Sequence, residues 1–158
     1  MIAARALLLV LALAGCAPAS APPHSELSAI PQRVVSLNPC TDAILAEVAD
    51  RGQIAAISHY SHDPRASSMP AARARLWPAT RGTVEAVLAL RPDLVLGSSF
   101  IDPATTAAYA RLGLRLERFG VARTLAESHA QVRRIAALTG HPGRGEALPT
   151  QAHQEPLG

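Results

Sequence analysis

Short apolar runs alternate with stretches of helically spaced apolar residues along most of the chain from Gln32 onward. Apolar residues at spacings of three and four predict helices over 41–52, 83–92, 102–113 and 124–140. Runs rich in aliphatic and β-branched residues predict strands in RVVSLN (33–38), QIAAIS (53–58), DLVLGSS (93–99) and LRLERFG (114–120). Because strands and helices take turns, the pattern predicts an α/β domain with a mainly parallel sheet flanked by helices.

The predicted helices have recognisable ends, and the segments between them do not all follow a pattern. Thr41 is a candidate N-cap and Gly52 a stop for the first helix, and Gly140 follows the last helix. Residues 59–82 are irregular and rich in Pro, Ser and Arg. After Gly140 the chain is polar and rich in helix breakers, and it has no periodicity beyond Leu148.

The loops that leave the carboxyl ends of the predicted strands are the expected ligand-binding positions. They span Asn38–Thr41, His59–Asp63 and Gly97–Asp102. Ligands bind at this edge of open parallel sheets, because the loops there surround a crevice. The pattern therefore predicts a site built from these three loops.

The start of the chain has the organisation of an export signal. A short positive start precedes an unbroken apolar run over 6–14, which is about half the roughly 20 residues that a bilayer-spanning helix needs. LAGC, which ends at Cys16, resembles the bacterial lipobox, in which the cysteine is acylated. We therefore expect a lipoprotein signal peptide over 1–15, a lipid anchor at Cys16 and a Pro/Ala/Ser-rich tether over 16–31. The alternative is cleavage at the APA of Ala17–Ala19, which would give a soluble periplasmic product.

Composition adds three restrictions. Apolar residues make up 49% of the chain and charged residues 17%, which is enough apolar surface for a packed core. All 15 basic residues are Arg and the formal net charge is only +3, so the charge gives no reason to expect nucleic acid as a partner. Two cysteines cannot form the disulfide framework of a small secreted domain.

Four segments follow one another in a recognisable order: RVVSLNPCTDAIL, IAAISHYSHDP, GTVEAVLALRPDLVLGSS and RRIAALTGHPGRGEAL. Together they resemble the amino-terminal lobe of periplasmic substrate-binding proteins of the cobalamin and ferric-siderophore type, which feed ABC importers. The resemblance implies a single Rossmann-like lobe over 32–148, the first of two lobes that are bridged by a long helix and hold the ligand between them. Residues 149–158 are expected to be a disordered or aberrant tail, with the second lobe missing.

The resemblance also assigns roles to individual residues. Tyr60 matches an aromatic residue that lines the cleft of cobalamin-binding members, and Glu85 matches the glutamate that docks onto arginines of the permease. Ser98 and Ser99 stand where cobalamin binders can carry an aromatic residue, which weakens the corrinoid interpretation. The expected ligand-binding residues are Asn38, Pro39, Cys40, Thr41, His59, Tyr60, Ser98 and Ser99.

The function implied by the resemblance is the capture of an iron chelate (siderophore or haem) or of cobalamin, and its delivery to an ABC permease in the inner membrane. Such a protein is a periplasmic monomer, is not an enzyme and needs no cofactor of its own, although its ligand can contain iron or cobalt. With one lobe, the chain is expected to bind ligand weakly or not at all. The alternatives are a truncated remnant of such a receptor with no transport role, and a secreted metal-binding or Cys-dependent enzyme.

Other chemistry is conceivable at three places. His59 and His62, with Asp63 beside them, carry metal-ligating groups, but a loop enforces no geometry and polar loop histidines are the expected reading. Cys40 would be an enzyme nucleophile only with a base such as His59 within reach, and a partly buried thiol is the default. A run of arginines without acids would attract an anionic ligand or form a solvated surface, and it comprises Arg65, Arg73, Arg75 and Arg81.

Overall fold

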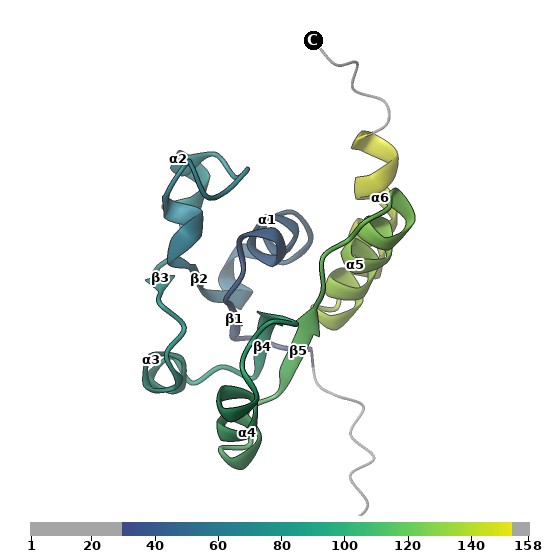
Figure 1. Cartoon of the computed structure of the whole chain (residues 1–158). Coiled ribbons are helices and arrows are strands. Elements are labelled where there is room, and N and C mark those ends of the chain that lie inside the picture. Colours follow the sequence, from purple (N-terminus) through teal and green to yellow (C-terminus); the bar gives the residue numbers. More distant parts are fainter. Residues whose placement is uncertain (1–29, 153–158) are drawn as a thin grey trace, which may run out of the picture.

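A five-stranded, all-parallel sheet forms the centre of the molecule, in a computed structural model that describes residues 30–152 (Figure 1). The strand order is β3-β2-β1-β4-β5. The strands are β1 (Val34–Ser36), β2 (Ile54–Ser58), β3 (Ala79–Thr80), β4 (Leu94–Ser98) and β5 (Leu116–Phe119). This confirms the predicted α/β class and the parallel sheet.

The central strands are hydrophobic on both faces because helices cover both sides of the sheet. β1 pairs in parallel with β2 on one side and with β4 on the other, with Val35 opposite Ala56 and Val95. Val34, Val35 and Leu94 to Leu96 are fully buried. The continuous apolar runs in the sequence therefore correspond to strands with no solvent face.

Helices cover both faces of the sheet and divide its core into two clusters (Figure 1). On one face, α1 (Pro39–Val48), α5 (Leu125–Leu138) and α6 (Pro142–Ala152) form the larger cluster, to which the short α2 (Ala71–Ala74) also contributes. On the other face, α3 (Val84–Ala89) and α4 (Pro103–Arg111) contribute Val87 and Tyr109 to a cluster of five buried residues. The smaller cluster depends heavily on one large side chain, that of Tyr109.

The start of α1 differs from the prediction. Asn38 is the N-cap, because its side-chain oxygen accepts the Cys40 N–H at 2.9 Å and Pro39 occupies the first turn. The predicted cap, Thr41, lies inside the helix with its hydroxyl bonded to the Asn38 carbonyl. The helix ends at Val48, before the predicted stop at Gly52, which lies in the short 3₁₀ helix η1 (Arg51–Gln53).

The segment after Gly140 also differs from the prediction, because it is helical to Ala152. Pro142 begins α6, and α6 packs closely on α5, where a side chain at Gly145 would collide with the Cβ of Ala136. The close packing on α5 outweighs the helix-breaking tendency of Gly145 and Pro149. The expected tail therefore begins as helix, and 153–158 lie outside the described residues.

The expected signal peptide, the acylated Cys16 and all but the last two residues of the expected tether also lie outside the described residues. Of those two, Ile30 is exposed, and Pro31 is buried with its carbonyl accepting a hydrogen bond from the Gln53 side chain. Within residues 30–152, no helix combines the length and the apolar character needed to cross a bilayer.

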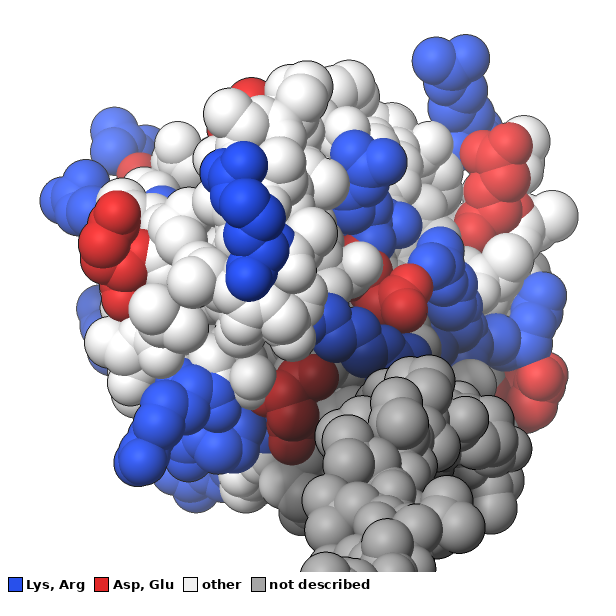
Figure 2. All heavy atoms as spheres, turned by 90° about the horizontal axis from the view of Figure 1, so that it is seen from below, with Lys and Arg blue, Asp and Glu red and all other residues white. Residues whose placement is uncertain are grey.

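On the face that carries α3 and α4, arginine and acidic side chains are interspersed among uncharged residues (Figure 2).

Candidate functional site

A cavity of about 550 Å³ opens at the carboxyl ends of the strands. The chain runs from β1 to β2 and β3 in one direction and then crosses to β4 on the other side of β1. Ligands of open α/β sheets bind at such a reversal of strand order. The cavity is lined by residues that follow β1, β2, β3 and β4, namely Leu37, Ser58, His59, Tyr60, Thr80, Arg81, Gly82, Phe100, Ile101 and Asp102, and by Thr105 and Tyr109 of α4.

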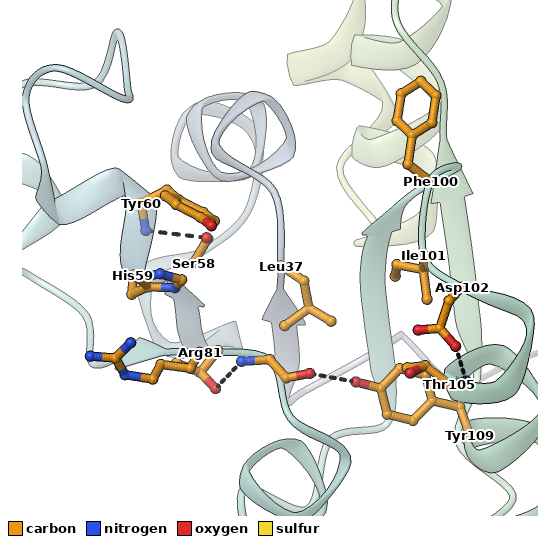
Figure 3. A pocket seen from close by; sticks show the side chains of 12 residues that line it. Leu37, Ser58, His59, Tyr60, Arg81, Phe100, Ile101, Asp102, Thr105 and Tyr109 are labelled. Atoms are coloured by element: carbon orange, nitrogen blue, oxygen red, sulfur yellow. Dashed lines mark hydrogen bonds between the residues drawn. The ribbon is translucent and has the colours of Figure 1, made fainter.

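Leu37, Ile101 and Tyr109 form the apolar part of the cavity lining between its two walls (Figure 3). The buried ring of Tyr109 reaches under the loop after β3, where the Tyr109 hydroxyl donates to the Gly82 carbonyl at 3.3 Å. Gly82 has a φ of 76°, which a residue with a side chain rarely adopts. Burial, and then the negative charge of Glu85, raise the pKa of the Tyr109 phenol, so Tyr109 stays a neutral donor.

The wall after β2 is formed by the 3₁₀ helix η2 (His59–His62). Ser58 caps this turn by accepting the Tyr60 N–H with its side chain. The rings of His59 and Tyr60 lie with their centroids 4.1 Å apart, and the Tyr60 side chain stands at the rim, 53% exposed. Arg81 lies on the same side of the cavity (Figure 3).

The opposite wall follows β4 and carries the second rim aromatic residue, Phe100, which is 78% exposed. Ser98 holds this turn, since its hydroxyl accepts the Phe100 N–H at 3.1 Å, and the Ser99 N–H donates to the Phe119 carbonyl. Asp102 caps α4 by accepting the Thr105 N–H. The Thr105 side chain, and then this backbone N–H, lower the pKa of the Asp102 carboxyl. The cavity therefore has an ionised carboxylate on this wall.

A buried carboxyl supports the first wall from behind. Asp42 on α1 is fully buried, and its Oδ2 accepts the Ser58 N–H at 3.0 Å and the Ser61 hydroxyl at 2.6 Å. Its Oδ1 has no hydrogen-bond partner among the described residues. Desolvation outweighs the neighbouring serine donors and raises the pKa of Asp42 to about 7.

The structure brings only part of the predicted site together. His59 and Tyr60 line the cavity, whereas the predicted residues in the loop after β1 do not. The Thr41 hydroxyl is buried and lies 2.8 Å from the Ser36 hydroxyl, Cys40 is an exposed thiol on the first turn of α1, and the loop meets the cavity through Leu37 instead. Asn38 and Pro39 serve as the cap and first residue of α1.

In the loop after β4, Ser98 and Ser99 shape the wall while its next three residues line it. Sequence reasoning missed Phe100 and Asp102 as single residues, and it named Arg81 only as one of a run of four arginines. The first two lie within the predicted loop Gly97–Asp102, and Asp102 followed by Pro103 is a recognisable helix start. Arg81 follows a two-residue strand that no periodic pattern revealed.

The groups considered for other chemistry have mostly structural partners. The His62 Nε2 lies 3.1 Å from the Ala74 carbonyl, and Asp63 pairs with Arg65. No cluster of three or more potential metal-ligating side chains occurs in residues 30–152. Of the predicted arginine run, Arg65 pairs with Asp63 and Arg73 with Glu47, whereas Arg81 lines the cavity.

Comparison with known proteins gives one consistent answer. The family model described as "Periplasmic binding protein" matches residues 34–156. A cobalamin-binding protein of Halobacterium salinarum is 28% identical over 116 residues, which cover 73% of this chain and 31% of that protein.

Solved structures show the same fold. A periplasmic haem-binding protein from Pseudomonas aeruginosa superposes with a TM-score of 0.66 at 22% identity, over 78% of this chain and 44% of that one. The periplasmic vitamin B12-binding protein of Vibrio cholerae gives 0.60 at 23% identity, over 79% and 48%. The chain thus spans about a third of the length of the curated relative and less than half of these two solved chains.

Proposed function

We propose, because this chain belongs to the periplasmic binding protein family, that its cavity is one wall of a binding site for an iron chelate or a cobalamin-type ligand. Membership confirms the resemblance seen in the sequence, and the length matched fits the amino-terminal lobe of a two-lobed protein. The comparisons are with binding proteins rather than enzymes. The proposed role is capture of the ligand for an ABC permease, without catalysis.

The observation that carries the proposal is the pair of exposed rings on the two walls. Tyr60 and Phe100 stand at the rim on either side of Leu37 (Figure 3). A ring offers a flat apolar face at little conformational cost, and Tyr60 adds a hydroxyl. A porphyrin or corrin macrocycle has a flat apolar face on which such a ring can stack. Arg81 on one wall and Asp102 on the other supply charges that orient polar substituents.

Named relatives support this class of ligand. The curated relative is a cobalamin-binding protein, and the solved relatives bind haem or vitamin B12. All three ligand types expected from the sequence, siderophore, haem and cobalamin, remain within the proposal. Ser98 and Ser99 stand where cobalamin binders can carry an aromatic residue. In this chain the next residue, Phe100, supplies an exposed ring in the loop after β4.

The first prediction is weak, specific binding by the full chain. One lobe leaves the outer face of the ligand in water, so we expect dissociation constants on the order of 10 to 100 µM for haem or cyanocobalamin. Amide chemical shifts of an isotope-labelled chain should move for residues at the cavity, chiefly near Tyr60 and Phe100. Replacing both rings, Tyr60→Ala with Phe100→Ala, should weaken binding at least tenfold.

Leu125→Ala is the matched control, because Leu125 is similarly exposed at 68% and does not line the cavity. It should bind as the parent chain does. Binding below about 0.1 µM would show that one lobe suffices. The absence of any shift with haem, cyanocobalamin and a ferric siderophore would overturn the proposed function.

We further propose that Glu85 is the contact of this lobe with the permease. Glu85 is exposed in the first turn of α3, and no ion pair to it occurs in the described part of the chain. An exposed carboxylate steers and registers a partner carrying arginines. Glu85→Arg should therefore reduce binding of the chain to its permease in detergent at least tenfold at low salt. Glu127→Arg, on α5, should have little effect, and equal loss from both changes would contradict the contact.

The expected cellular location of the protein follows from its family. Family membership implies a periplasmic location, and we propose the acylated Cys16 as its anchor. Incorporation of labelled palmitate that depends on Cys16 is the measurement for it.

A further inference from the structure

We propose that the amino edge of the sheet is a docking surface for an anionic phospholipid membrane. The amino edge is the end of the molecule at which the parallel strands begin, opposite the cavity. Its charged residues are Arg33, Arg51, Arg91, Arg111, Arg115, Arg134 and Arg144, together with Asp50, Asp93 and Glu117. The inference goes beyond the proposed ligand site, and it uses the proposed anchor at Cys16 only for the distance to the membrane.

The topology of the sheet brings these arginines together although they are distant in the sequence. Arg33 and Arg115 directly precede β1 and β5, and Arg91 comes three residues before β4. Arg51 begins η1, which leads into β2, and Arg111 ends α4, the helix that returns the chain to this edge. Because all five strands are parallel, residues that precede strands lie at the same edge.

The carboxylates of the amino edge are engaged in other contacts. Arg134 on α5 donates to the Glu117 carboxylate of β5, and Arg144 on α6 pairs with Asp50 at 2.8 Å. Asp93 uses its carboxylate to accept the backbone N–H groups that precede β1. These contacts place Arg134 and Arg144 at the amino edge, and they leave its other arginines with few acidic neighbours.

The amino edge carries the whole formal net charge of the described residues. It has seven arginines against three carboxylates, whereas the rest of residues 30–152 has seven arginines against seven acidic residues. Four of the edge arginines are exposed and form no ion pair within residues 30–152, namely Arg33, Arg51, Arg91 and Arg111. Guanidinium groups gathered at one end of a molecule match a surface of phosphate groups.

Exposed apolar side chains accompany these arginines. Ile30 is 53% exposed and Leu112 is 46% exposed. Leu112 follows Arg111 at the end of α4, and Ile30 lines a groove of about 300 Å³ with Arg115 and Arg134. At a bilayer surface the arginines meet phosphate groups while the apolar side chains enter the boundary with the acyl chains. A dissolved polyanion would leave the apolar side chains in water, so the combination favours a membrane.

The chain reaches the amino edge from the side of the proposed lipid anchor. Ile30 lies 14 residues after Cys16, so an extended chain of at most roughly 50 Å separates this edge from the membrane. A lipid anchor and a basic surface together hold a protein at a membrane more firmly than either does alone. The cavity, at the opposite edge, would then open away from the bilayer and stay free for ligand.

The test measures how the full chain partitions onto phosphatidylcholine vesicles with and without about 30% phosphatidylglycerol, at about 50 mM salt. The apolar run over 6–14 should contribute equally to both kinds of vesicle. The ratio of the two partition coefficients therefore isolates the electrostatic part of the binding. The parent chain should prefer the anionic vesicles at least tenfold, and about 0.5 M salt should remove the preference.

Two variants separate the amino edge from net charge. The test variant neutralises three exposed edge arginines that have no carboxylate partner in the described residues, by Arg51→Gln, Arg91→Gln and Arg111→Gln. The matched control neutralises three exposed arginines elsewhere, by Arg65→Gln, Arg118→Gln and Arg123→Gln. The preference for anionic vesicles should fall at least fivefold in the test variant and less than twofold in the control. Circular dichroism and thermal unfolding check that both variants fold as the parent does.

A second measurement reads the orientation of the lobe without those variants. One fluorophore is attached to Cys40, an exposed thiol on the first turn of α1 at the cavity end of the sheet, in a chain with Cys16→Ser. The other is attached to Leu112→Cys in a chain with Cys16→Ser and Cys40→Ser. Leu112 is 82 residues beyond Ile30, so the segment that follows Cys16 cannot by itself bring it to the lipid. A quencher on the lipid headgroups of anionic vesicles should quench the Leu112 label at least threefold more than the Cys40 label.

The outcomes separate this inference from the proposed ligand site. Equal loss of preference in the two triple variants, equal quenching of the two labels, or no preference for anionic vesicles would overturn it. Binding to heparin without a preference between the vesicles would assign the amino edge to a dissolved polyanion and would also overturn it. None of these measurements depends on haem or cyanocobalamin, whose binding tests the proposed function alone.

Discussion

Raising the pH from about 4 to about 8 is expected to lower the free energy of unfolding by on the order of 4 kcal/mol through Asp42 alone. The pKa of this carboxyl is about 7 in the folded chain, against an ordinary value of 3.8. Because the folded state holds the proton more tightly, its contribution is complete below pH 3.8 and is lost as the pH rises through 7. Urea unfolding at a series of pH values measures the slope.

In Asp42→Asn the free energy of unfolding should change little between about pH 4 and about pH 8, because an amide does not ionise in this range. Asp93→Asn should keep the parent slope, because Asp93 is exposed and precedes β4 at the other end of the sheet. Carboxylates whose pKa is lowered, those of Asp50, Asp63 and Asp102, act in the opposite direction and cost stability only as the pH falls through their low pKa values. A parent chain whose stability changes by less than about 1 kcal/mol between pH 5 and 8 would contradict the assignment.

Tyr109→Ala is expected to cost about 3 to 5 kcal/mol of folding stability. Tyr109 is the largest fully buried side chain of the described residues and the only aromatic member of the five-residue cluster under α3 and α4. The cavity that its removal would leave adds to the free energy lost with the burial of the ring. Thermal and urea unfolding give the loss directly.

Tyr109→Phe is the matched control, because it keeps the ring and removes only the hydrogen bond to Gly82. It should cost about 1 kcal/mol. Equal losses in the two variants would show that the hydroxyl, rather than the ring, secures the floor of the cavity. A loss below about 1.5 kcal/mol for Tyr109→Ala would show that the helices collapse around the vacated space.

Much of the fold could be predicted from the sequence because the central strands are buried on both faces. The buried part of β4, Leu94 to Leu96, is a continuous apolar run, and this pattern is visible without knowledge of the neighbouring strands. The ends of the helices are harder to predict than the strands. Asn38 and Thr41 are both good caps by residue type, and only the position of Pro39 in the first turn favours Asn38. β3 has two residues and α6 has three breakers, so neither carries a periodic signal.

The site could be predicted as loops rather than as side chains. Parallel topology fixes which loops meet, so the loop His59–Asp63 could be predicted from the pattern of strands. Tyr60 itself was assigned from the family resemblance. Which residue of a loop faces inward depends on how the turn is held. The Ser98 hydroxyl accepts the Phe100 N–H and so holds the turn that brings Phe100 to the rim. Asp42 lies on α1, four residues after the N-cap Asn38, and supports η2 through bonds to residues 16 and 19 positions away. Such distant contacts leave no mark on local periodicity.

The two rim rings follow strands whose distance from each other is fixed by the sheet. Tyr60 follows β2 and Phe100 follows β4, and these strands are the two hydrogen-bonded neighbours of β1. Their separation is therefore two strand spacings, about 10 Å, set by backbone hydrogen bonds rather than by side-chain packing. A change of ring would alter the surface that a ligand meets while leaving the distance between the walls unchanged. The sheet would thus determine which sizes of ligand fit between the walls. The residues at the rim would determine which ligand chemistry is favoured, and they could change without altering the sheet.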